Sequence, residues 1–134
     1  MYEDDLITQF EEEFEIDGRK FKLKVMTGFE KDKMIDKIME IDPVSKTIKY
    51  SIAKRNEYYL SNCVLSIPYD LKKMVDKLKV VLNDREIEEV KNKEWRDLEP
   101  QIRGKVLQLL PNKIRVALIE KLTELNDAIE LKKN

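Results

Sequence analysis

The chain of 134 residues contains no histidine and one cysteine, Cys63. Histidine is the commonest general base and transition-metal ligand at neutral pH, so its absence excludes Cys–His and Ser–His nucleophile pairs. A structural zinc site needs four ligands, mostly Cys and His, and one cysteine without histidine cannot supply them. We therefore expect no catalytic residues, no metal and no cofactor. A lone cysteine forms no internal disulfide, and we expect Cys63 to be a small buried apolar side chain rather than a redox thiol.

Glycine is also scarce, and the three glycines are Gly18, Gly28 and Gly104. Their spacing does not allow a phosphate-cradling loop. Runs of carboxylates such as Glu11–Glu13 could in principle serve acid–base or Mg²⁺ chemistry. In a chain of which 40% is charged, such runs usually form solvated faces, and we interpret them in that way.

The chain has no excess of charge of either sign and no long apolar run. Lys and Arg total 26 against 27 Asp and Glu, whereas proteins that grip nucleic acid usually carry a basic excess. The apolar runs are too short to span a membrane, and the N-terminus lacks the basic and apolar regions of a signal peptide. The sequence thus predicts a cytoplasmic protein that binds neither nucleic acid nor membrane, folded as a single domain over residues 1–134.

What the chain does contain is a clear β-hairpin signal over residues 10–26. Asp17-Gly18 separates two runs with alternating polarity, and this dipeptide favours a two-residue type I′ turn, in which both residues adopt positive φ. The turn places Phe14 opposite Phe21. One face then carries opposed Glu and Lys side chains, and the other is apolar. The apolar positions are Phe10, Phe14, Ile16, Phe21, Leu23 and Val25.

Helical periodicity dominates the remainder, residues 28–131. Thr27 and Glu30 fit a capping box, and apolar residues at helical spacing predict helices over 28–40, 52–67, 71–82 and 100–110 and from 112 onward. We expect a loop over 43–50, and a charged linker with a short solvated helix over 84–99. The predicted fold class is α+β, mostly α, with the N-terminal hairpin packed on a bundle of about four to five helices.

Candidate partner-binding residues lie on the last helix and at two isolated aromatics. The helix carries an apolar stripe near the chain end, formed by Ile114, Leu118, Leu122 and Leu125. The stripe either docks a partner or completes the core. Trp95 lies among charged residues and either anchors an interface or closes the edge of the core. Tyr58 lies beside the apolar stripe of its helix and is either exposed or in contact with a partner.

Two segments and their order suggest a family. The segment from Phe14 to Met26 has the sequence FEIDGRKFKLKVM, and LLPNKI from Leu109 to Ile114 leads into the terminal amphipathic helix. Over roughly residues 10–125 this layout resembles the small tail assembly chaperones encoded in the tail gene clusters of contractile phages and prophages. In that family a hydrophobic-Asp-Gly-Lys-x-Phe module precedes the helices, and a Leu-Pro turn precedes the last one. The region 70–99 is longer and more charged than the family pattern.

The resemblance implies a non-enzymatic protein of the infected or lysogenic bacterial cytoplasm. It would bind and shield the tape-measure protein, which is long and helical, during tail assembly and would be absent from the finished particle. A small chaperone could cover the client's apolar stripes by helix-in-groove docking. A structural tail or baseplate component and a small helical regulatory or protein-interaction module are the alternatives. The sequence leaves the oligomeric state open.

Overall fold

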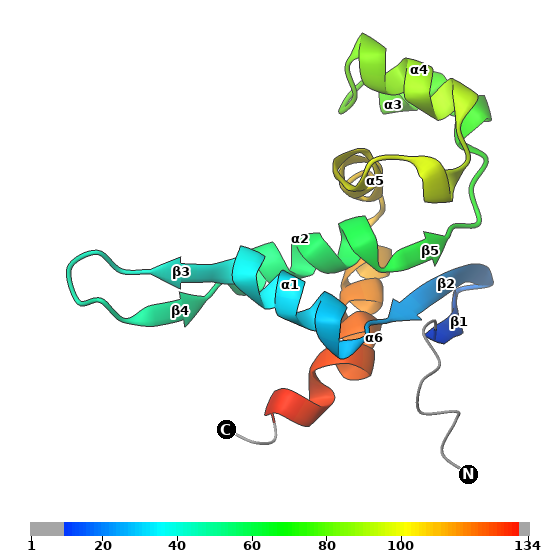
Figure 1. Ribbon diagram of the computed structural model, residues 1–134. Helices are drawn as coiled ribbons and strands as arrows, with labels where there is room; N and C mark the ends of the chain where they lie inside the picture. Colours follow the sequence, from blue (N-terminus) through cyan, green and yellow to red (C-terminus); the bar gives the residue numbers. More distant parts are fainter. Residues whose placement is uncertain (1–9, 132–134) are drawn as a thin grey trace.

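The computed structural model describes residues 10–131, with side chains from Glu11 to Asn126. It confirms an α+β, mostly α fold in which an N-terminal hairpin packs on helices (Figure 1). The strands are β1 (Phe10–Ile16), β2 (Arg19–Val25), β3 (Met39–Ile41), β4 (Ile48–Tyr50) and β5 (Val64–Ser66). The helices are α1 (Gly28–Ile38), α2 (Ile52–Asn62), α3 (Val75–Leu78), α4 (Asp84–Asn92), α5 (Pro100–Leu107) and α6 (Asn112–Leu131), with short 3₁₀ turns η2 (Leu71–Lys73) and η3 (Trp95–Asp97).

The N-terminal hairpin has the predicted register and turn. Phe14 pairs with Phe21 across β1 and β2, and the Glu and Lys residues of the other face also oppose one another. Asp17 and Gly18 both have positive φ, at 49° and 81°, as a type I′ turn requires. Phe21 is buried and Lys22 is exposed, so the two faces are those that the alternation predicts.

Strand β5 corrects the predicted helix over 52–67. Helix α2 ends at Asn62, and β5 pairs antiparallel with β2, giving the strand order β1-β2-β5. The amide of Lys24 donates to the carbonyl of Cys63 at 2.8 Å where the two segments meet. The helical pattern continues past Asn62, but backbone bonds to the free edge of β2 stabilise an extended conformation there, because tertiary context overrides local propensity.

Strands β3 and β4 correct the predicted loop over 43–50. The capping box of Thr27 and Glu30 is present as predicted, but α1 ends at Ile38 and the chain continues as a second hairpin. Asp42 does more than stop the helix, because its carboxylate accepts a hydrogen bond from the amide of Val44 at 2.8 Å. This local bond stabilises a turn and lets β4 return along β3.

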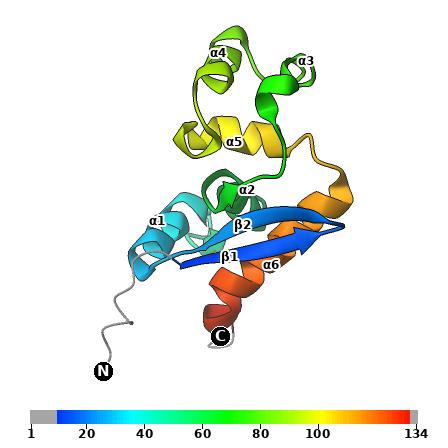
Figure 2. The ribbon, with the colours of Figure 1, turned by 90° about the vertical axis from the view of Figure 1, so that its right-hand side faces the viewer.

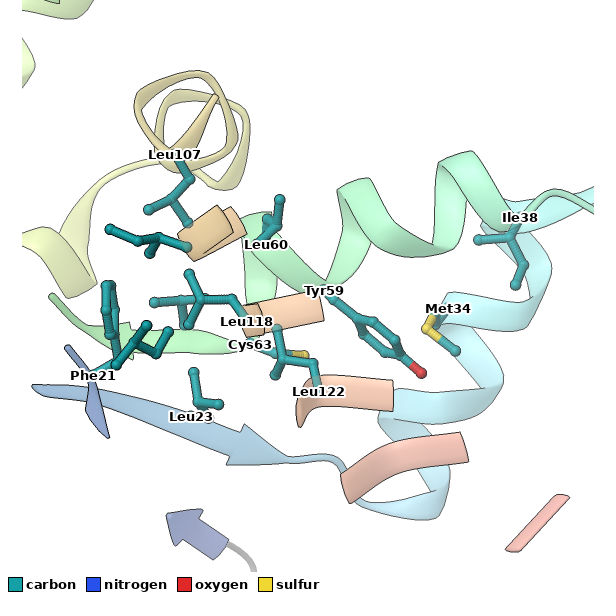
Figure 3. Packing of buried hydrophobic residues seen from close by; sticks show 13 residues of the cluster. Phe21, Leu23, Met34, Ile38, Tyr59, Leu60, Cys63, Leu107, Leu118 and Leu122 are labelled. Carbon is teal, nitrogen blue, oxygen red and sulfur yellow. The ribbon is translucent and has the colours of Figure 1, made fainter. Parts of the chain in front are cut away.

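Helix α6 covers the apolar face of the N-terminal hairpin (Figure 2). Ion pairs hold the helix to that hairpin at two places, from Lys121 to Glu12 at 3.3 Å and from Lys113 to Asp17 at 3.1 Å. The main core lies between this sheet, α1, α2 and α6 (Figure 3). Its most buried large side chains include Phe21, Leu23, Met34, Tyr59, Leu118 and Leu122.

A second, smaller core joins α3, α4 and α5. The short helix predicted within the charged segment 84–99 is present as α4, which has its own capping box between Asn83 and Glu86, but its Ile87 and Val90 are buried rather than solvated. The predicted helix over 71–82 is instead divided into η2 and the short α3. The buried members of this cluster are Leu78, Leu82, Ile87, Val90, Leu98, Ile102 and Val106. Few apolar residues are therefore enough to tie the charged segment to the body.

A buried amide joins α6 to the end of β2. Asn126 accepts a hydrogen bond from the amide of Met26 at 2.8 Å and donates to the carbonyl of Lys24 at 3.3 Å. Asn126→Ala is expected to lower the free energy of unfolding by about 1–3 kcal/mol, because it leaves a partly buried N–H without a partner. Thr123→Ala is the control, since that hydroxyl donates only to Ile119 on the same helix. Urea denaturation of both variants measures the difference, and equal losses would contradict the assignment.

A buried carboxylate makes the stability depend on pH. Glu86 accepts a hydrogen bond from the amide of Asn83 and pairs with Lys105 at 2.9 Å. The Asn83 amide first, and then Lys105, hold the pKa of Glu86 below its ordinary value. A depressed folded pKa stabilises the fold above the unfolded value of about 4.3, and this stabilisation is lost as the pH falls through the folded pKa.

We therefore expect Glu86→Gln to destabilise the fold at pH 7 by about 1–3 kcal/mol. The gap from the wild type should shrink steadily below about pH 4, once Glu86 is protonated in both states. Urea titrations at several pH values between 7 and 3 measure the gap. The same substitution at the exposed Glu88 of α4 is the matched control. A gap that does not change with pH would show that the carboxylate charge is not the cause.

Candidate functional site

The apolar stripe of α6 lies in the core. Ile114, Leu118 and Leu122 are buried, and Leu125 is partly buried against the same cluster. Of the two interpretations that the sequence allows, the burial favours completion of the core. The burial has a simple cause, because the apolar face of the N-terminal hairpin needs cover and α6 supplies it in the same chain.

Trp95 closes an edge of the core. Its indole Nε1 donates to the carbonyl of Val64 at 2.8 Å, and the guanidinium of Arg96 donates to Leu65 at 3.1 Å. Both acceptors belong to β5, which is an edge strand of the sheet β1-β2-β5. These two hydrogen bonds tie η3 to β5. Trp95 contacts both hydrophobic clusters and joins them.

Tyr58 is half-buried at the side of the main core. Burial raises the pKa of its hydroxyl, and the ammonium of Lys37 lies 5.6 Å from the ring centroid. Tyr58 lines a small cavity of about 330 Å³ next to the cleft that contains Trp95. The two aromatics thus line neighbouring hollows that share Leu65 and Arg96, and no residue of the α6 stripe lines either hollow.

The cleft that contains Trp95 has a volume of about 870 Å³. Its walls carry charges of both signs, and several of these charges are already paired. Lys72 contacts Glu94 at 3.3 Å, and Arg96 contacts Glu11 at 3.3 Å. A cleft whose charges are internally compensated offers little attraction to a charged ligand.

A third hollow, which we call the apolar groove, lies between η2, α3 and the turn from α5 to α6. Its volume is about 410 Å³, and its only charged lining residues are Arg19 and Lys77. Val80 is 79% exposed and Leu109 is 40% exposed at its rim. The other lining residues are Tyr69, Leu71, Met74, Leu78, Val106, Leu107, Leu110, Pro111 and Ile114. The groove therefore presents accessible apolar side chains beside two basic groups.

Sequence reasoning did not find the apolar groove. Val80 lies out of phase with the apolar residues that predict the helix over 71–82, and Leu109 lies near the end of the predicted helix over 100–110. The groove's residues come from the N-terminal hairpin, from residues 69–80 and from the turn between α5 and α6, and only the tertiary packing brings these segments together. The one feature of the sequence that pointed to the groove is Val80, an apolar residue out of phase with the predicted helix over 71–82.

The remaining side-chain chemistry is modest. Cys63 is a free, buried thiol, and burial raises its pKa to about 12, so the reactive thiolate is scarce at neutral pH. Among residues 10–131, no group of three or more His, Cys, Asp or Glu side chains is arranged to hold a metal ion. None of the helices in the same range combines the length and apolarity that crossing a bilayer requires. No family model, curated protein or solved structure matches the chain.

Proposed function

We propose that this protein is a non-enzymatic protein-binding module that holds an apolar helical segment of a partner in the apolar groove. The observation that supports the proposal most directly is the exposure of Val80 and Leu109 beside a hollow of about 410 Å³. An amphipathic helix binds such a groove through a few anchoring side chains spaced along one face. Exposed apolar residues gathered at a hollow commonly mark interaction sites.

The rim of the groove indicates the charge of the partner. Arg19 and Lys77 line it, and no acidic residue does. A helix with acidic residues flanking its apolar anchors would gain favourable contacts there, which would contribute orientation and association rate more than affinity. Because such exposed charges are screened, binding should weaken moderately as salt increases.

For the partner we propose the tape-measure protein of a contractile phage or prophage tail, with this chain acting as a tail assembly chaperone. The support is the resemblance of layout. A hairpin with the FEIDG turn precedes the helices, and the LLPNKI segment leads into the last helix. A long helical client exposes apolar stripes before the tail tube closes around it. A groove of limited size would shield such a stripe and still release it.

Leu109→Asp is expected to weaken binding of the tape-measure protein at least about tenfold, because a charge placed at an apolar anchor costs more than about 1.4 kcal/mol. Val116→Asp is the matched control, since Val116 is also 40% exposed but does not line the groove. Isothermal titration calorimetry with tape-measure segments measures both variants.

Thermal melts of the two variants must match the wild type for the comparison to hold. Loss of binding in the Leu109 variant alone supports the apolar groove. Equal losses in both variants, or no loss in either, would overturn it. Recovery of the protein in assembled tail particles would contradict the chaperone role and favour a structural component.

A further inference from the structure

The hairpin arm, residues 39–50, stands away from the body of the molecule (Figure 1). Strands β3 and β4 pair Met39 with Tyr50, Glu40 with Lys49 and Ile41 with Ile48. Directly opposed residues point to the same side of a ribbon, and successive residues point to opposite sides. One face of the arm is therefore wholly apolar, and the other carries the Glu40–Lys49 pair.

The apolar face of the arm is uncovered. Ile41 is 61% exposed and Ile48 is 56% exposed, and Tyr50 and the tip residue Val44 are exposed as well. A two-stranded ribbon is marginal in water, and three or more strands, or a layer packed on the face, are needed for stability. The N-terminal hairpin meets this requirement with α6 and β5, whereas the arm has no equivalent layer among the described residues.

Local hydrogen bonds within the arm fix its turn and its base. The Asp42 carboxylate accepts hydrogen bonds from the amides of Val44 and Ser45 and so fixes the turn. At the base, the amide of Ser51 donates to the carbonyl of Ile38 at 2.9 Å. A surface that is already in its bound shape loses little conformational entropy on association. The arm therefore suits a docking role.

The composition of the apolar face points to what covers it. Ile41 and Ile48 lie opposite each other at the centre of this face. Each strand therefore contributes the same apolar side chain to the centre. Such a face is complementary to a copy of itself about a two-fold axis, and two-fold dimers are the commonest oligomers. The charges of the arm also cancel, with Glu40 and Asp42 against Lys46 and Lys49. The arms of two copies therefore do not repel each other. A neutral arm also does not favour a strongly acidic or a strongly basic partner.

We infer that the hairpin arm is a dimerisation element, and that the arms of two copies stack with their apolar faces together. Stacked sheets lie about 10 Å apart and interdigitate their side chains. The dimer raises the local strand count from two to four, which supplies the missing layer. Glu40 and Lys49 remain in solvent on the outer faces. The arm is separate from the apolar groove, so this inference stands independently of the proposed function.

Two matched variants on one strand test the interface. Ile48→Ser removes a central apolar side chain, and Lys49→Ser changes the neighbouring residue, which faces the other way. In sedimentation equilibrium the wild type should form a dimer of the 16.0 kDa chain as concentration rises. Ile48→Ser should raise the dissociation constant at least about tenfold, and Lys49→Ser should change it less than about twofold. Both variants should keep the melting temperature of the monomer.

Cross-linking shows whether the two arms meet each other. Because Cys63 is buried, a cysteine introduced on the arm is the only accessible thiol in the described part of the chain. With a short bismaleimide, Ile48→Cys should give a cross-linked dimer, because residues near a two-fold axis lie close to their own copies. Lys49→Cys, on the outer face, should give far less.

Several outcomes would overturn the inference. One is a wild type that stays monomeric at all concentrations. Another is a dimer that Ile48→Ser leaves intact. A dimer that Leu109→Asp abolishes, with no cross-linking of Ile48→Cys to itself, would mean that the arm enters the apolar groove of the second copy instead. The first two results leave the calorimetric comparison of Leu109→Asp with Val116→Asp unchanged, so failure of dimerisation and failure of partner binding are distinguishable.

Discussion

Truncation after Leu110 is expected to abolish the cooperative thermal unfolding of this protein. The cut removes α6, whose Ile114, Leu118 and Leu122 are buried in the main core. Each large-to-small change at such a site costs about 2–5 kcal/mol. Loss of all three side chains therefore removes free energy comparable to the whole free energy of unfolding of a typical domain, about 5–15 kcal/mol. It also uncovers the apolar face of the N-terminal hairpin. Circular dichroism and calorimetry of the truncated chain measure the effect.

A milder change separates loss of this helix from a general effect of shortening the chain. Leu118→Ala should lower the free energy of unfolding by about 2–5 kcal/mol. Val116→Ala, on the exposed side of the same helix, should change it by less than about 1 kcal/mol. A truncated chain that still melts sharply would mean that α6 is dispensable for the fold. The stripe would then again be a candidate docking face.

Phe21→Ala is expected to have the next largest effect, a loss of about 3–5 kcal/mol. Phe21 is completely buried on the inner face of β2, and its ring meets that of Tyr69 edge to face at a centroid distance of 6.0 Å. Replacing the ring by a methyl group therefore removes both the transfer free energy of the ring and an aromatic contact, and it leaves a cavity.

Lys22→Ala is the control for Phe21→Ala, because Lys22 is the adjacent residue and points to solvent. An exposed lysine contributes little, so its loss should change the stability by less than about 1 kcal/mol. Urea denaturation midpoints at pH 7 compare the two variants directly. Similar midpoints would mean that the two faces of the N-terminal hairpin have been assigned the wrong way round.

The features that were predicted correctly depend on contacts between residues close in the chain. Asp17-Gly18 specifies its turn because its two residues tolerate positive φ, and the turn then determines the register of seven residues on each side. The capping box of Thr27 and Glu30 likewise acts over one helical turn. Pro100 begins α5 as predicted, since it lacks the N–H that the first turn leaves unpaired.

The features that were missed depend on partners far away in sequence. Strand β5 has three residues within a helical pattern, and its extended form exists because β2 offers a free edge. The hairpin arm joins segments on both sides of Asp42-Pro43, and its short strands are below the length at which alternation is recognisable. The apolar groove needs Val80 and Leu109 side by side, which no local rule requires.

The amphipathic pattern of α6 shows where sequence and tertiary structure divide. The sequence by itself determined that Ile114, Leu118 and Leu122 share one face, because a 3.6-residue period allows no other arrangement. Only the tertiary structure decided what that face meets, since the hydrophobic effect is non-directional and favours any apolar cover. For α6 the cover is the N-terminal hairpin of the same chain. For the hairpin arm the part of the chain that the structure describes supplies no such cover, and for that reason the arm is the surface at which we expect a second copy.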